Sequence, residues 1–125
     1  MLLPLVAYAV TQIREVKQEE TYNEQFVYEQ VLSPREYLRT LVSGGDFVIL
    51  DRIIICESGW KPEAKNSHST ASGLFQFLAS TWSGWGEGDV FNPYDNIKGG
   101  VRLYQAQGTR PWLASESCWK NVISR

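Results

Sequence analysis

The sequence predicts a mainly α-helical domain of the α+β class, in which a small β-hairpin or loop region lines a cleft. Three observations lead to this fold class. The 125 residues suffice for one domain with a modest core. Helix-capping residues followed by glycine stops recur after residue 33. A nearly all-apolar stretch between two such signals is typical of a buried helix.

The composition excludes several classes of function. Hydrophobic residues make up 43% of the chain and charged residues 21%, as in an ordinary soluble domain. A net charge of −2 gives no electrostatic reason to expect binding to nucleic acid or to an anionic membrane. The five Trp and six Tyr residues exceed what a small core needs. Because aromatic rings offer flat apolar platforms with a polar edge, part of this set suits a carbohydrate site.

Residues 1–45 are predicted to form an N-terminal extension with an apolar start. Leu2 to Val10 is apolar but interrupted by Pro4, and it is shorter than the roughly 20 residues of a membrane span. It also lacks the basic leader and cleavage site of a signal peptide. The trimmed end of an anchor, a strand and a tail are all open interpretations, and membrane contact is expected only in the first case. Residues 11–36 are rich in charge and form a peripheral segment.

One short helix is expected within this extension. Ser33 would cap it and Pro34 would occupy its first position. The helix then runs to about Val42 and stops at Gly44-Gly45. The domain proper is predicted to span residues 46–125.

The first helix of that domain is the apolar one. Asp46 can cap it, and Phe47 to Cys56 is interrupted by only two charged residues. Ser58-Gly59 ends it. Residues 65–77 are polar and then small, and they indicate a loop or hairpin that leads into a strand-like edge.

The remaining elements follow from caps and periodicity. Ser80 is expected to cap a short helix that runs through Trp82. Asn92 to Asp95 reads as a turn and cap, with Asp95 as the capping acid. An amphipathic helix over residues 96–107 ends at Gly108. The tail, Pro111 to Trp119, is expected to be irregular.

Glu57 is the candidate catalytic residue. It lies at the C-terminal end of the apolar helix, where burial and the negative end of the helix dipole both disfavour its charged form. Both effects raise its pKa. A glycosidase acid must hold its proton near neutral pH and deliver it to the leaving glycosidic oxygen.

Four short motifs extend this interpretation: Glu57-Ser58-Gly59-Trp60, Ala71 to Phe77, Ser80-Thr81-Trp82, and Asn92 to Ile97. In this order the motifs resemble those of the lysozyme-like superfamily, specifically the soluble lytic transglycosylases. The stretch from Gln107 to Trp119, together with the run that begins at Cys56, is also similar to the resuscitation-promoting factors. The resemblance covers about residues 46–119 and implies a lysozyme-like fold and a peptidoglycan glycan strand as partner.

The resemblance also implies roles for individual residues. Glu57 would be the general acid and base, and Ser58 would help to orient it. Residues 73–76 would line the cleft: Gly73 would allow close approach of a sugar, Phe75 would pack behind, and Gln76 would bind substrate through its amide. These four cleft residues are Gly73, Leu74, Phe75 and Gln76. Tyr94 and Tyr104 could contact the sugar or Glu57. An Ala-Tyr-Asn-Ala-Gly motif that many family members carry is replaced here by residues 101–108, so its contacts are not transferred.

Glu57 has no evident second carboxylate. Glu63 is too near in sequence, and Asp89 and Asp95 come later. An N-acetyl sugar can supply its own nucleophile through its acetamide, which leaves one Glu sufficient. The expected reaction is cleavage of the MurNAc-β-1,4-GlcNAc bond with 1,6-anhydro-MurNAc ends. Hydrolysis of the same bond, as by a muramidase, is the alternative.

The other reactive residues are few. Cys56 and Cys118 are either free buried thiols or a disulfide closing a loop of about 60 residues, worth roughly 4 kcal/mol in the chain-entropy model. We predict the disulfide, and with it an extracytoplasmic location. His68 is the single histidine and is expected to be a solvated loop residue rather than a metal ligand. No cofactor and no metal are expected, and a monomer is expected.

Two hypotheses from other classes compete with the enzyme. One is a non-catalytic carbohydrate-binding module on the same scaffold. The other is a structural or interaction domain of a phage tail or secretion apparatus. The aromatic content favours the first, whereas the presence of both Glu57 and Gln76 favours catalysis.

Overall fold

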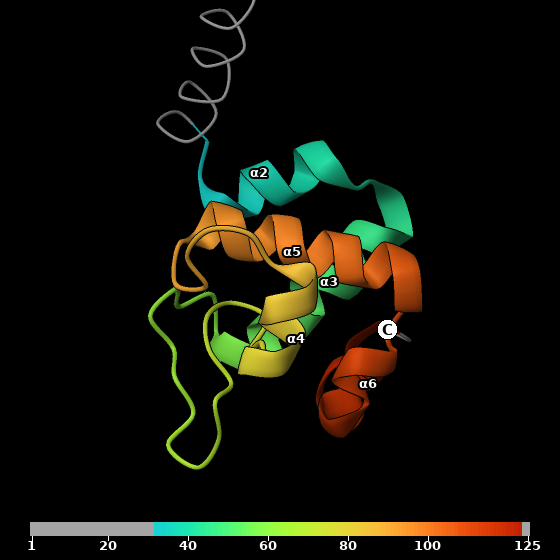
Figure 1. The fold of residues 1–125 in the computed structure, drawn as a ribbon. Coiled ribbons are helices and arrows are strands. Elements are labelled where there is room, and N and C mark those ends of the chain that lie inside the picture. The colour runs from blue at the N-terminus through green and yellow to red at the C-terminus, as the bar shows by residue number, and fades with distance from the viewer. Residues whose placement is uncertain (1–31, 124–125) are drawn as a thin grey trace, which may run out of the picture. The chain divides into compact units, whose positions relative to one another are not determined.

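The computed structural model describes residues 32–123, and the compact unit to which the elements below belong begins at Pro34. The predicted mainly helical fold is confirmed. The interpretations of the apolar start and of the charged segment up to residue 31 lie outside the described residues, and the division at residues 45 and 46 stays a prediction. In order, the elements are α2 (Pro34–Leu41), α3 (Gly44–Ser58), α4 (Ala79–Trp85), α5 (Pro93–Gln107), the 3-10 helix η1 (Arg110–Ser115) and α6 (Glu116–Ile123) (Figure 1).

Helix α2 is held to α3 by a buried carboxylate. Pro34 occupies its first position, as predicted. Arg35 donates two hydrogen bonds of 2.9 Å to the carboxylate of Asp51, which also accepts one of 3.0 Å from Trp60 Nε1. Burial raises the pKa of Asp51, but the bonds from Arg35 and Trp60 outweigh it and the net pKa is lowered. The ionised Asp51 therefore binds both α2, through Arg35, and the turn after α3, through Trp60.

Helix α3 is the buried helix that the apolar stretch predicts. Its inner face carries Phe47, Leu50, Ile53 and Ile54. The helix starts earlier than expected, because Gly44 with φ of 57° opens it and Asp46 lies in its first turn rather than at its cap. It ends at Gly59, whose amide N–H donates to the carbonyls of Ile54 and Ile55. This closing turn fixes the direction of the last residues of α3.

The region expected to be a hairpin is a loop with two isolated antiparallel bridges, Lys65 with Ser72 and Ser72 with Phe77. The loop leads directly into α4, which begins at Ala79, so Ser80 lies inside the helix and is not its cap. Thr70 Oγ1 accepts the Ala79 amide N–H at 3.0 Å, so a loop hydroxyl replaces the predicted Ser80 cap. The helix also continues beyond Trp82 to Trp85.

Helix α5 runs along α2 and passes in front of α3 (Figure 1). Asn92 caps it by accepting the amide N–H groups of Tyr94 and Asp95, with Pro93 in the first turn. The predicted cap at Asp95 is wrong, because its carboxylate accepts the Asp89 amide N–H at 3.0 Å. The Asp95 side chain thus stabilises the loop that precedes α5 and does not cap the amide groups of the helix.

The tail predicted to be irregular is helical. The 3-10 helix η1 follows α5 and α6 continues it, with a kink at Trp112. Trp112 and Trp119 are each 5% exposed, and Trp119 Nε1 donates to the Trp112 carbonyl at 3.1 Å. Because these two indole rings are buried only when the tail folds back on α3 and α5, local sequence signals did not reveal its helices.

Gly100 of α5 is needed for packing. A Cβ at this position would overlap the ring of Phe75, whereas a Cβ at Gly45 in α3 would meet nothing within 4 Å. We therefore expect Gly100→Ala to lower the free energy of unfolding by about 1–3 kcal/mol, the usual cost of overpacking. Gly45→Ala is the matched control and should be neutral or stabilising by roughly 0.5 kcal/mol. Urea unfolding measures both, and a Gly100→Ala protein as stable as the parent would contradict the packing described.

Candidate active site

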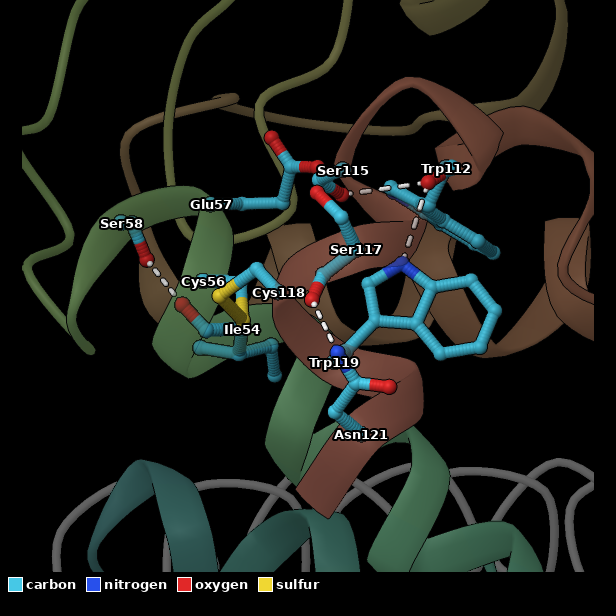
Figure 2. The surroundings of a disulfide bond; sticks show 10 residues. All are labelled: Ile54, Cys56, Glu57, Ser58, Trp112, Ser115, Ser117, Cys118, Trp119 and Asn121. Carbon is cyan, nitrogen blue, oxygen red and sulfur yellow. Dashed lines mark hydrogen bonds between the residues drawn. A yellow bond between two sulfur atoms is a disulfide. The ribbon is translucent and has the colours of Figure 1, made fainter. Parts of the chain in front are cut away.

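Glu57 lies in the last turn of α3 with its carboxyl group half-buried against η1 (Figure 2). Ser115 Oγ donates a hydrogen bond of 2.5 Å to Glu57 Oε1. Burial raises the pKa of Glu57, while the bond from Ser115 lowers it, and the net shift is upward. The direction predicted from the sequence is confirmed, with burial as the main cause. Such a carboxyl group keeps its proton at higher pH than an exposed glutamate does.

A disulfide joins the end of α3 to α6. Cys56 and Cys118 have a Cα–Cα distance of 6.0 Å and a sequence separation of 62, so the predicted bridge is present (Figure 2). Cys56 immediately precedes Glu57, and Cys118 follows Ser115 by three residues. The bridge therefore closes a short covalent path between the two residues of the Glu57–Ser115 hydrogen bond.

Segment η1 also contacts the loop that precedes α4. Trp112 Nε1 donates to the Phe75 carbonyl at 3.1 Å, and the two rings are 5.3 Å apart at their centroids. Ser115 also lies 3.1 Å from the Trp112 carbonyl. One short helix thus connects Glu57 to the turn formed by residues 73–76.

Within that turn the whole residues Leu74 and Phe75 are 0% and 1% exposed. They belong to the core, so the predicted contacts of these two residues with a substrate are not available in this structure. Gln76 has a φ of 53°, a left-handed conformation that is uncommon for a residue with a side chain. Its Nε2 donates to the carbonyls of Ala64 and Gly73, at 3.1 and 2.9 Å. The amide nitrogen thus stabilises the left-handed turn from within.

Packing inside the fold requires glycine at residue 73. A Cβ there would overlap the side chain of Asn96 and the carbonyl of Val90. Asn96 is 1% exposed; its Oδ1 accepts the Phe75 amide N–H at 2.9 Å and its Nδ2 donates to Val90 at 2.8 Å. Sequence reasoning missed Asn96. The available signal was an Asn inside an amphipathic helix beside its apolar positions, where a buried amide must have partners.

Ser58 and Tyr94, two other predicted site residues, make contacts within the fold. The Ser58 hydroxyl donates to the Ile54 carbonyl at 3.2 Å, back along its own helix (Figure 2). The Tyr94 ring packs edge-on against Tyr37, with centroids 5.3 Å apart. In the described part of the chain, the hydroxyl that donates a hydrogen bond to the Glu57 carboxylate belongs to Ser115 and not to Ser58.

Tyr104 lies at the far end of α3. Its hydroxyl donates to Asp46 Oδ1 at 2.7 Å, and burial together with this bond raises the pKa of Tyr104 to about 12. Asp46 and Glu57 are separated by eleven residues of α3, or roughly 16 Å along the helix axis. Tyr104 therefore stabilises the contact between α5 and the start of α3 and is not brought to Glu57.

An open pocket of about 330 Å³ lies between α4, the end of α5 and the start of η1. We call it the α4–α5 pocket. Its lining combines hydroxyl, amide and aromatic groups: Ser80, Thr81, Gly84, Trp85, Leu103, Gln107 and Pro111. Glu57 does not line it. Pro111, which lines the pocket, and Ser115, which contacts Glu57, both belong to η1.

Within residues 32–123, no group of three or more His, Cys, Asp and Glu side chains is placed to hold a metal ion. In the same part of the chain no helix is long and apolar enough to cross a membrane. His68 is exposed, and its amide N–H donates to Asn66 Oδ1 at 2.7 Å.

Comparison with known proteins identifies the family of the chain. Residues 43–113 match the family described as the transglycosylase SLT domain, which is more than half of the chain. Searches of curated proteins and of solved structures find no match. The family match includes Glu57 and the turn at residues 73–76, and it ends inside η1. The likeness of the last stretch to the resuscitation-promoting factors is not covered by it and stays a prediction.

The raised pKa of Glu57 has a consequence for stability. Below the ordinary glutamate pKa of about 4.3 the residue is protonated in both the folded and the unfolded chain, so burial costs nothing through ionisation. As pH rises, the unfolded chain ionises first, and the fold loses stability until pH exceeds the folded pKa. Glu57→Gln does not ionise and avoids this loss. We expect its melting temperature to exceed that of the parent at neutral pH and to equal it in acid.

Thermal unfolding followed by circular dichroism measures this difference. Glu63→Gln is the matched control, because Glu63 is exposed and follows α3 by a few residues. It should melt with the parent at every pH. A Glu57→Gln protein that melts below the parent at neutral pH would contradict the raised pKa.

Proposed function

Because the chain belongs to the transglycosylase SLT domain family, we propose that it is a peptidoglycan lytic transglycosylase with Glu57 as its catalytic acid and base. The family acts on peptidoglycan, which lies outside the cytoplasm. The single observation that carries the proposal is the half-buried Glu57 carboxyl group at the end of α3, with a raised pKa and a fixed hydrogen-bond partner. The disulfide agrees with an oxidising, extracytoplasmic location.

The first step is proton donation. Protonated Glu57 donates to the glycosidic oxygen between MurNAc and GlcNAc, and the bond from MurNAc C1 to that oxygen breaks. The acetamide oxygen of MurNAc attacks C1 as the leaving group departs, which takes up the positive charge that develops there. The GlcNAc portion leaves with the proton from Glu57, and Glu57 is left ionised.

The second step returns the proton. Ionised Glu57 accepts the proton of the MurNAc 6-hydroxyl, whose oxygen attacks C1 and displaces the acetamide oxygen. The product is a 1,6-anhydro-MurNAc end, and Glu57 regains its proton. No water is consumed. One carboxyl group performs both roles, as the absence of an evident partner acid in the sequence requires.

The surroundings of Glu57 support this use of a single acid. Its pKa is shifted by burial and by Ser115, with no contribution from another charged group. In contrast, a second carboxylate across the cleft would raise it by repulsion. The carboxylates of Asp51 and Asp95 are occupied by structural hydrogen bonds. These features favour substrate assistance over a nucleophilic carboxylate.

The α4–α5 pocket supports a polymeric sugar substrate. Trp85 offers an aromatic surface for the apolar face of a sugar ring, and Thr81 and Gln107 offer hydrogen-bonding groups beside it. Because Glu57 does not line the pocket, a single sugar there would not react. A glycan strand extended along η1 would occupy the pocket and place another of its bonds at Glu57.

The proposal is tested with purified peptidoglycan. Parent protein should release anhydro-muropeptides, which mass spectrometry identifies, and Glu57→Gln should reduce their rate of release by a factor of 100 or more, because general acid catalysis contributes about 10²–10⁴-fold. Glu63→Gln should release them at the parental rate. Reducing ends alone would point to muramidase action. Absence of product from the parent protein would contradict an enzyme and leave a binding module.

A further inference from the structure

We propose that Ser115 is a positioning residue for this reaction: its hydroxyl holds Oε1 of Glu57, so that Oε2 is the oxygen that exchanges protons with the substrate. The proposal rests on the proposed role of Glu57. It concerns a residue outside the family match, in the segment that local sequence signals did not describe.

The geometry around the carboxyl group distinguishes its two oxygens. Ser115 Oγ is 2.5 Å from Glu57 Oε1, and within residues 32–123 no hydrogen bond reaches Oε2. Ser115 has one hydroxyl proton, and its second acceptor, the Trp112 carbonyl, is farther away at 3.1 Å. Donation to Glu57 is therefore the shorter of the two choices, and it is charge-assisted when Glu57 is ionised.

This contact suits a residue that must be an acid first and a base later. When Glu57 carries its proton on Oε2, Oε1 is a carbonyl oxygen and still accepts from Ser115. When the proton has left, Oε1 shares the negative charge and accepts more strongly. The carboxyl group can thus keep one orientation through both steps, which avoids reorientation between them.

Ser115 is itself fixed from three sides. The Trp112 indole donates to the Phe75 carbonyl, and the Trp119 indole donates to the Trp112 carbonyl. The disulfide at Cys118 joins the same segment to the residue before Glu57 (Figure 2). The Ser115 hydroxyl is thus attached to a backbone segment held by these contacts, and from there it donates to the Glu57 carboxyl group.

The charged groups on neighbouring elements do not account for the orientation. On α6, Glu116 and Lys120 form an ion pair of 3.0 Å with each other. On α2, Arg35 is paired with Asp51. The guanidinium of Arg110 on η1 and that of Arg52 on α3 make no contribution to the Glu57 shift, which comes from burial and Ser115. A change in Glu57 titration on removal of the Ser115 hydroxyl would therefore report that bond.

The first test measures Glu57 without catalysis. The side-chain carboxyl signals of ¹³C-labelled glutamate are titrated by NMR, and the signal that Glu57→Gln lacks is assigned to Glu57. Ser115→Ala should raise the Glu57 pKa above that of the parent, because it removes a donor that favours the ionised form. Ser115→Thr keeps a hydroxyl and should restore the parental value. Ser117→Ala, an exposed serine on α6, should leave it unchanged.

The second test measures activity on soluble glycan strands. Ser115→Ala should lower kcat by roughly tenfold with little change in KM, since the lost bond is to Glu57 and not to the substrate. The alkaline limb of its pH profile should move to higher pH, because Glu57 stays protonated there. A merely structural loss would lower activity without moving the limb. If Ser115→Ala does not fold, Ser115→Gly takes its place.

The outcomes separate the two proposals. An unchanged Glu57 pKa in Ser115→Ala overturns the role of Ser115, whatever the activity. A raised pKa that Ser115→Thr reverses supports the contact. If the pKa behaves in this way but the parent releases no product, the proposed function has failed, and the role of Ser115 in catalysis falls with it.

Discussion

The hydrogen bond between Ser115 and Glu57 is the contact on which the site depends. It places a carboxyl group from the end of α3 against a segment that lies 58 residues later in the chain. Burial there raises the pKa of Glu57, and the hydroxyl limits that rise. The balance between these two effects suits a group that must donate a proton and then take one back. The disulfide next to Glu57 and the two buried tryptophans of the tail keep the partners together.

A second set of contacts fixes the position of the loop before α4 relative to Ser115 and Glu57. Asn96 bonds the backbone at Phe75 and Val90, and glycine at residue 73 leaves room for its side chain. Phe75 in turn packs on Gly100 and Trp112. Small residues and one buried amide therefore determine how closely α5, the loop and η1 approach. In this arrangement Gln76 and its strained turn lie on the same braced unit as Glu57.

What could be predicted from the sequence was local. The apolar run before Cys56 and the glycine after Ser58 determine α3 and its end, and so they placed Glu57 at the end of a buried helix. The raised pKa followed from that placement. The roles of Asn96 and Gly73 could not be predicted, because each depends on a neighbour more than twenty residues away in the sequence. The tail was misjudged for the same reason: its helices form where Trp112 and Trp119 become buried. Tyr104 was expected near Glu57, but the antiparallel course of α5 brings it to the start of α3.

The family match ends two residues before Ser115. The catalytic candidate therefore lies inside the shared domain, while the group that orients it lies just beyond, in a tail fixed by the disulfide.

In the proposed reaction Glu57 works alone, with the 6-hydroxyl of the substrate in place of water. Digestion of purified peptidoglycan in water enriched in ¹⁸O tests it most directly, with the products analysed by mass spectrometry. We predict anhydro ends that carry no ¹⁸O. Incorporation of one ¹⁸O atom at each new reducing MurNAc end would contradict it and establish hydrolysis.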